Sequence, residues 1–299
     1  MASLKELFEF SLFKIAKAPL SILSRKLCLA LGQTLGLAFY YLDKKHRLIA
    51  LANLKIAFGK ELPSSELKRI ARNSFMHFGK TLMDIIKLPQ LKEEKINTLI
   101  NVEGEENLLK ALREKKGVLP FSAHYGSWEI AMSFFTTKGK LSGVARALDN
   151  KLLEKELLKL RTSHGSRIIY KHQAAKKILR SLQAGEMVAF LIDQNVLRRQ
   201  AVFVDFFGKK AATTPSLASF SLKTKSPLIP VFCYPTSSHA YHIKIFSPLS
   251  ITLEGNYNQD VLKITQICTK IIENQIRKNP DYWLWFHNRW KTRPEEEEA

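Results

Sequence analysis

The chain has 299 residues, 45% of them hydrophobic, so it is long enough to bury a full core and too apolar for the disordered class. Its 47 Lys and Arg against 27 Asp and Glu give a formal net charge of +20, which favours nucleic acid, anionic membrane, phosphorylated substrates or an acidic protein partner. The cysteines Cys28, Cys233 and Cys268 lie far apart, which indicates neither a disulfide framework nor a zinc site and fits a reducing compartment.

The N-terminal segment is apolar and basic. Residues 7–15 are rich in Leu, Phe and Ile, and after a basic pair residues 27–42 form an uncharged run of about 16 residues, just short of the ~20 that a comfortable membrane span needs. Small residues in this run and Tyr40 and Tyr41 at its end suit a membrane helix with an interfacial aromatic end. The alternative is a buried core helix. We expect residues 1–45 to be a membrane anchor of amphipathic helices that either spans or lies on the bilayer.

The next segment, residues 46–100, has a helical pattern. Gly59 ends one helix, and Ser64 or Ser65 caps another whose apolar residues recur at 3–4 spacing towards Pro89. Residues 96–104 are predicted to form a strand that enters a turn.

From Gly117 onward, short apolar runs alternate with helical stretches, which is the pattern of an α/β fold. An aromatic segment, residues 280–290, closes the fold, and the acidic tail after it is expected to be solvated. Strands are predicted over residues 118–122, 141–145, 167–170, 187–192, 227–234 and 241–245, and helices from about 127 and over 150–163, 174–182, 213–222 and 261–276.

His124 follows the first of these strands, and Glu129 lies in the first turn of the next helix. Residues five apart on a uniform helix point about 140° away from each other. If His124 precedes the helix, however, the turn containing Gly126 can fold its imidazole back onto Glu129. The spacing therefore predicts a histidine polarised by a carboxylate, which is suited to removing a proton from a substrate.

Two further polar residues come directly after predicted strands, Arg146 and Asp193. In open α/β sheets, ligands bind outside the carboxyl ends of the strands, so His124, Arg146 and Asp193 are expected to share one crevice. Structural alternatives are a satisfied turn or core residue for His124 and a helix or turn cap for Asp193. Arg161 could likewise be a surface charge near a helix C-terminus.

No protein nucleophile is evident, because Ser122 and Ser127 flank the histidine without a G-x-S-x-G elbow. Direct attack by a substrate hydroxyl is the simpler chemistry. No P-loop, dinucleotide, EF-hand or nucleic-acid-binding motif is present either, so we expect no metal, no cofactor and no nucleic-acid partner.

The segment His124-Tyr-Gly-Ser-Trp-Glu129 resembles the H-x4-D/E signature of the lysophospholipid acyltransferase superfamily, and more narrowly the bacterial lipid A biosynthesis acyltransferases, the lauroyl and myristoyl transferases. Ser127 stands where Asn is common in that family, from which we expect a hydrogen-bonding difference rather than loss of activity. Matches in the same order along the chain support the narrower likeness: Arg161 with Gly165, Asp193-Gln194, Phe206-Phe207-Gly208, Ala212-Thr213-Thr214-Pro215, and the closing Pro280–Lys291.

The resemblance implies a glycerol-phosphate acyltransferase-like fold, in which a central mixed sheet is flanked by helices, with a catalytic domain over residues 46–299 (helical entry 46–100, α/β core 101–294). It implies transfer of a fatty acyl group from acyl carrier protein to a hydroxyl of a lipid A precursor at the cytoplasmic face of the bacterial inner membrane. Anionic lipids are expected as further partners.

Carried over by position, the resemblance makes His124 the general base and Glu129 its orienting partner. Arg161, Asp193, Gln194 and Gly126, and more weakly Arg146, become substrate-binding candidates. The alternatives are a different acceptor, such as another glycolipid or phospholipid (for example a phosphatidylinositol mannoside), a thioester hydrolase, or a non-catalytic basic protein that binds membranes.

Overall fold

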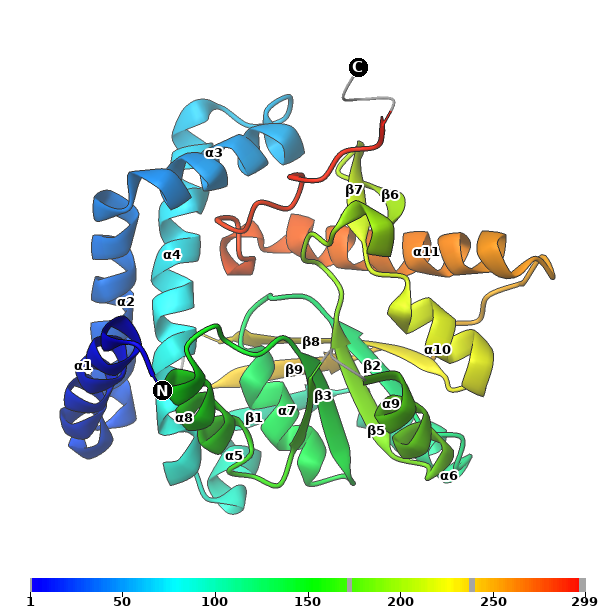
Figure 1. The fold of residues 1–299 in the computed structure, drawn as a ribbon, viewed down its shortest axis with the longest axis horizontal. Coiled ribbons are helices and arrows are strands. Elements are labelled where there is room, and N and C mark those ends of the chain that lie inside the picture. The colour runs from blue at the N-terminus through cyan, green and yellow to red at the C-terminus, as the bar shows by residue number, and fades with distance from the viewer. Residues whose placement is uncertain (1, 171–173, 237–239, 296–299) are drawn as a thin grey trace.

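The computed structural model describes residues 2–170, 174–236 and 240–295. Its centre is a seven-stranded mixed sheet in the order β1-β9-β8-β2-β5-β3-β4, in which only β8 and β9 pair antiparallel (Figure 1). The predicted α/β class with a mixed sheet flanked by helices is confirmed. The strands are β1 (Ile100–Glu103), β2 (Leu119–Ser122), β3 (Leu141–Ala145), β4 (Arg167–Tyr170), β5 (Met187–Leu191), β8 (Leu228–Pro235) and β9 (Tyr241–Ile245).

Helices cover both faces of this sheet, and alternate residues of β8 show how the core is divided. Phe232 packs into one apolar cluster with α9, α10 and α11, whereas Val231 and Cys233 pack into a second cluster with α6 and α7. Successive residues of a strand point to opposite faces of the sheet. Because helices cover both faces, a central strand such as β8 must be apolar at nearly every position. The helices are α5 (Glu93–Leu99), α6 (Glu105–Arg113), α7 (Trp128–Thr136), α8 (Lys151–Arg161), α9 (Ala174–Gln183), α10 (Ser216–Thr224) and α11 (Tyr257–Lys278).

One local prediction is corrected, and one hairpin was not predicted. The strand expected over 96–104 is only β1, because its pairing with β9 runs from Ile100 to Glu103 and the residues before it form α5. Strands β6 (Val202–Phe206) and β7 (Lys209–Thr213), which were not predicted, pair as a separate antiparallel hairpin. The sequence hid this hairpin because its turn places a non-glycine residue, Phe207, at φ +53°.

The N-terminal part of the chain, before α5, contains α1 (Leu4–Ile22), α2 (Arg25–Leu42), α3 (Lys44–Phe58) and α4 (Ser64–Lys87). Figure 1 shows α2 lying along α4. A Cβ atom at Gly36 would lie 2.2 Å from the carbonyl oxygen of Phe75, so only glycine permits this close approach of the two helices. The other face of α2, with Leu27, Leu31 and Leu35, is exposed. The core-helix alternative for residues 27–42 therefore holds for one face only.

A buried polar cluster ties α2 to the rest of the fold. The Arg25 guanidinium donates to Oδ1 of Asp84 on α4, at 3.2 Å from Nε, and to the hydroxyl of Tyr241 on β9. Burial raises the pKa of Asp84, an effect that the Arg25 charge opposes. Among the described residues, no helix is long and apolar enough to cross a membrane.

Candidate active site

The pairing of β2 with β5 brings His124 and Asp193 together. Ser122 pairs with Leu191 in this parallel register, and each strand is followed two residues later by one of the two polar side chains. Neighbouring parallel strands that end at the same level deliver the residues after them to the same place. Nδ1 of His124 consequently lies 2.9 Å from Oδ1 of Asp193.

Asp193 is buried, and three donors satisfy its carboxylate. Oδ1 accepts from Nδ1 of His124, while Oδ2 accepts from the backbone N–H of His124 at 2.9 Å and from the indole N–H of Trp283 at 2.8 Å. Burial by itself would raise the pKa of Asp193, but the charge of His124 and these hydrogen bonds outweigh burial and lower the pKa to about 2. The carboxylate is therefore ionised near neutral pH.

An ionised carboxylate only accepts hydrogen bonds, so the proton shared with Asp193 belongs to Nδ1 of His124. In the neutral imidazole this leaves Nε2 as the basic nitrogen. The side-chain amide nitrogen of Gln194 lies 3.4 Å from Nε2, somewhat farther than the ~2.6–3.2 Å at which a base takes a proton from a hydroxyl group. His124 is thus held as a base with its acceptor nitrogen directed away from Asp193.

Glu129 has a different partner from the one expected. Its Oε1 atom accepts from Nε of Arg161 at 2.7 Å and from the indole N–H of Trp128 at 3.2 Å. Within the described residues, no hydrogen bond joins His124 to Glu129, so the prediction that Glu129 orients the imidazole is wrong in this structure. The physical reason is that α7 begins at Trp128, which turns Glu129 towards the end of α8, where Arg161 lies.

Gly126 shapes the turn between strand and helix. Its φ is +62°, and a Cβ atom there would lie 1.9 Å from the carbonyl oxygen of Cys233. Its N–H donates to the carbonyl of Tyr282 at 2.9 Å, and the next N–H, of Ser127, donates to that of Cys233 at 2.8 Å. Gly126 therefore has a backbone role in forming the loop of His124.

A cavity of about 320 Å³ opens beside these residues. Its polar lining includes His124, Glu129, Arg161 and Gln194, and exposed Arg146, which pairs with Asp149, also lines it. Its wall is apolar and runs between α7 and the sheet. That wall includes Phe121, Ala131, Met132, Phe135, Leu141, Gly143, Val144, Ile168, Ala189 and Val231.

His124, Glu129, Arg146, Arg161 and Gln194 thus line one cavity, whereas Asp193 is buried behind His124. The arrangement is suited to proton transfer next to an apolar acyl chain. Within residues 2–170, 174–236 and 240–295, no cluster of three or more His, Cys, Asp or Glu side chains is arranged to hold a metal ion.

One known protein family matches this chain over nearly its whole length. The family model described as bacterial lipid A biosynthesis acyltransferase matches residues 3–292. The chain belongs to this family. It is therefore an acyltransferase, as the resemblance implied.

Three curated relatives of this acyltransferase come from Escherichia coli (strain K12). A lipid A biosynthesis palmitoleoyltransferase is 26% identical over 265 residues, covering 88% of this chain and 85% of the relative. A lauroyltransferase is 25% identical (89% and 85% covered), and a myristoyltransferase is 23% identical (84% and 77% covered). A solved structure, the 1-acyl-sn-glycerophosphate acyltransferase from Thermotoga maritima, is 14% identical with a TM-score of 0.38, covering 87% of this chain and 99% of that one.

One residue at the site of this acyltransferase was not predicted. Trp283 reaches Asp193 from the far end of the chain. The sequence showed its segment only as an aromatic closing stretch, and neither periodicity nor spacing indicates that an indole N–H there contacts a carboxylate 90 positions earlier.

Proposed function

We propose that this acyltransferase moves a fatty acyl group from the thioester of acyl carrier protein to a hydroxyl of a lipid A precursor, at the cytoplasmic face of a bacterial inner membrane. The observation that carries the proposal is the His124–Asp193 pair at an apolar cavity. The names of the relatives support the acceptor class.

The reaction requires one base. Nε2 of His124 takes the proton of the acceptor hydroxyl while the hydroxyl oxygen attacks the thioester carbonyl. The resulting tetrahedral intermediate collapses, its C–S bond breaks, and the carrier thiolate leaves with the proton that His124 held. An ester and a free thiol are the products, and no acyl-enzyme forms. Because the donor brings the acyl group already activated, no cofactor is needed.

The other polar residues of the site each have a role in this scheme. Asp193 fixes the tautomer of His124 and stabilises the imidazolium that forms. Arg161, held by Glu129, places a positive charge at the cavity, where it binds a phosphate of the acceptor or stabilises the oxyanion. Glu129 thus acts through Arg161. The apolar wall between α7 and the sheet holds the acyl chain.

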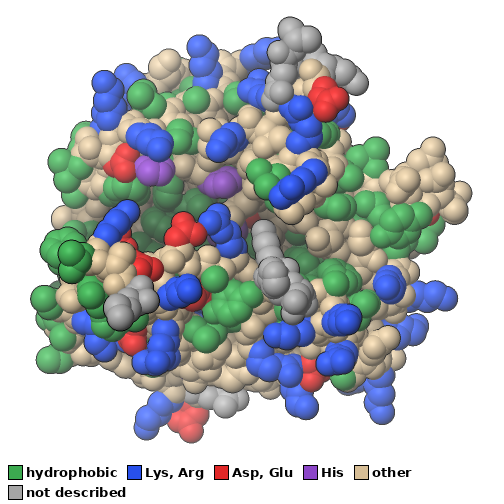
Figure 2. All heavy atoms as spheres, in the orientation of Figure 1, with side chains coloured by type: hydrophobic (Ala, Val, Ile, Leu, Met, Phe, Trp, Pro, Cys, Tyr) green, Lys and Arg blue, Asp and Glu red, His purple; other side chains and the backbone are tan. Residues whose placement is uncertain are grey.

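Membrane attachment is supported by the surface of α1. Leu4, Phe8, Leu12 and Ile15 are 58–87% exposed and lie on one side of this helix. Figure 2 shows hydrophobic side chains gathered at the left edge of the molecule, over α1 and α2, and Lys and Arg side chains spread across the rest of the face. An apolar helix face flanked by basic residues suits a helix that lies in an anionic lipid interface. The charge of +20 also suits the acidic carrier.

The test is a reconstituted reaction of the purified protein with acyl-carrier thioester and a lipid A precursor, followed by thiol release and by mass spectrometry of the lipid. His124→Ala should lower the rate by about 10²–10⁴-fold, the usual contribution of a general base. Near-normal transfer by folded His124→Ala would overturn the mechanism. Thiol release without acceptor would indicate a hydrolase, transfer only to another lipid would reassign the acceptor, and no thiol release would leave a binding protein.

A further inference from the structure

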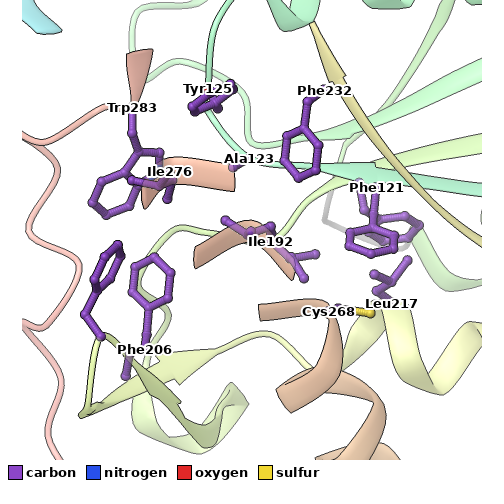
Figure 3. Packing of buried hydrophobic residues seen from close by; sticks show 14 of the residues in the cluster. Phe121, Ala123, Tyr125, Ile192, Phe206, Leu217, Phe232, Cys268, Ile276 and Trp283 are labelled. Carbon is purple, nitrogen blue, oxygen red and sulfur yellow. The ribbon is translucent and has the colours of Figure 1, made fainter. Parts of the chain in front are cut away.

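Trp283 comes from the C-terminal part of the chain and lies in the core beneath the site. It follows the short helix η3 (Pro280–Tyr282), is 1% exposed, and packs with ring centroids 5.5 Å from Phe206 and 4.6 Å from Trp285. Figure 3 shows Trp283 facing Phe206 and lying near Ile276 of α11. This packing accounts for a large apolar side chain at position 283, but it does not account for the direction of the indole N–H group.

That N–H donates to Oδ2 of Asp193. We propose that Trp283 is a positioning residue of the acyl transfer, because its indole N–H holds the Asp193 carboxylate in the orientation that keeps Oδ1 on Nδ1 of His124. This inference rests on the proposed role of His124 as the base. Trp283 does not line the cavity, so its effect reaches the substrate through Asp193 and His124.

The hydrogen-bond geometry shows what the indole adds. Without it, both donors that remain on the carboxylate among the described residues come from His124: the backbone N–H on Oδ2 and Nδ1–H on Oδ1. The carboxylate would then be held only by the residue that it orients. Oδ2 would also keep one donor where it now has two, and the loss of a hydrogen bond to a buried charged acceptor costs free energy. Both effects loosen the contact that fixes the imidazole tautomer.

The backbone around Trp283 also joins the two loops of the site. On the β2 side, the N–H of Leu284 donates to the carbonyl of His124 at 3.2 Å, and Tyr282 accepts from Gly126. On the β5 side, the backbone N–H of Asn195 donates to Nε2 of His287 at 2.9 Å. The C-terminal segment therefore bridges the loop of His124 and the loop of Asp193, and Trp283 is its contact with the carboxylate itself.

A neighbouring tryptophan offers a matched control. Trp285 is also fully buried, but its indole N–H donates to the carbonyl of Pro280 at 2.7 Å. Replacing either ring by 3-benzothienylalanine, through an expanded genetic code, keeps the bicyclic shape and exchanges the N–H for sulfur. The replacement at 283 removes a hydrogen bond to Asp193, whereas the replacement at 285 removes one to the backbone.

We expect the 283 analogue to lose about 10- to 100-fold in kcat with KM for both substrates little changed, because a hydrogen bond to a charged group is deleted and substrate binding is not. The 285 analogue should keep kcat within about 2-fold of the native value, because the deleted hydrogen bond does not involve Asp193 or His124. The second readout is the NMR signal of the His124 Nδ1–H proton in protein with labelled histidine, which should shift in the 283 analogue alone. Equal kcat in the two analogues, or an unchanged Nδ1–H signal, would overturn the proposal.

The two readouts also separate this proposal from the proposed function. If the native protein transfers no acyl group, the function fails, but the Nδ1–H signal still decides whether Trp283 holds Asp193 on His124. If transfer occurs and both analogues behave alike, the function stands and Trp283 is only a core residue.

Discussion

Nδ1 of His124 lies 2.9 Å from Oδ1 of Asp193, a residue 69 positions later in the chain. The same aspartate accepts the backbone N–H of His124, so a single buried carboxylate fixes both the ring and the main chain of the proposed base. The glutamate five positions after the histidine instead binds Arg161. The site therefore contains two separate pairs. Asp193 and His124 are placed for proton transfer, and Glu129 holds the positive charge of Arg161.

Asp193→Asn should reduce kcat by about 10²–10⁴-fold, the usual size of a general-base contribution, because His124 would no longer be held in the tautomer that can accept the proton. The amide oxygen must stay at the Oδ2 position to serve two donors, which turns the amide NH2 towards Nδ1 of His124 and favours the wrong tautomer. Steady-state kinetics on folded protein checks this. Asp205→Asn, at an exposed residue of β6, is the control. An unaltered kcat in Asp193→Asn would refute the role of Asp193.

Gly143→Leu should shorten the acyl chain that the enzyme prefers. A Cβ atom at position 143 lies 2.7 Å from Cε of Met132, so a leucine side chain fills part of the apolar cavity. Each methylene that no longer fits should lower the relative kcat/KM by about 4-fold, which corresponds to ~0.8 kcal/mol. Competition between carrier thioesters of different length, read by mass spectrometry, measures the ratio. Ser142→Ala, whose side chain points to the opposite face of β3, should leave the preference as it is. A Gly143→Leu profile like that of native protein would contradict the placement of the chain.

The double variant Phe8→Asp, Ile15→Asp should bind more weakly to lipid vesicles containing about one quarter phosphatidylglycerol. The two substitutions remove apolar side chains that α1 would bury in the bilayer, and they add negative charges that anionic lipid repels. Each buried side chain of this size contributes about 1.5–3 kcal/mol, so the loss should exceed about 100-fold. Sedimentation with vesicles gives the partition coefficient. Leu253→Asp removes another exposed apolar residue, 49% exposed against 71% for Phe8 and Ile15, far along the chain, and should have little effect. Vesicle binding that survives in the double variant would assign membrane contact to another surface.

The fold should lose stability as the pH falls from about 6.5 to about 4, in part through His77. Burial lowers the pKa of His77 to about 4, so between these values the unfolded chain binds a proton that the folded protein does not. Proton binding by the unfolded chain therefore lowers the free energy of unfolding as the pH falls from about 6.5 to about 4. For one such histidine the total loss is about 3 kcal/mol relative to pH values above 6.5. Urea unfolding of native protein and His77→Gln across this range checks the effect: the variant should show a shallower slope, and parallel curves would exclude His77 as the source.

Much of this arrangement was determined by local sequence. The apolar runs predicted strands at 141–145, 167–170 and 241–245 that agree with the structure, because a strand buried on both faces requires a short continuous apolar stretch. The position of His124 and Asp193 immediately after strands predicted that they would lie in one crevice. The signature around His124 predicted the acyltransferase family, which the match over residues 3–292 shows.

Tertiary structure alone decided which carboxylate serves the histidine. Glu129 is five positions from His124, and Asp193 is 69, yet the register of β2 against β5 brings Asp193 within hydrogen-bond distance, and the start of α7 turns Glu129 to Arg161. Trp283 arrives from farther still. Strand register and the docking of a C-terminal segment depend on contacts between distant parts of the chain. A local pattern of residues therefore does not predict which distant side chains will lie within hydrogen-bond distance of each other.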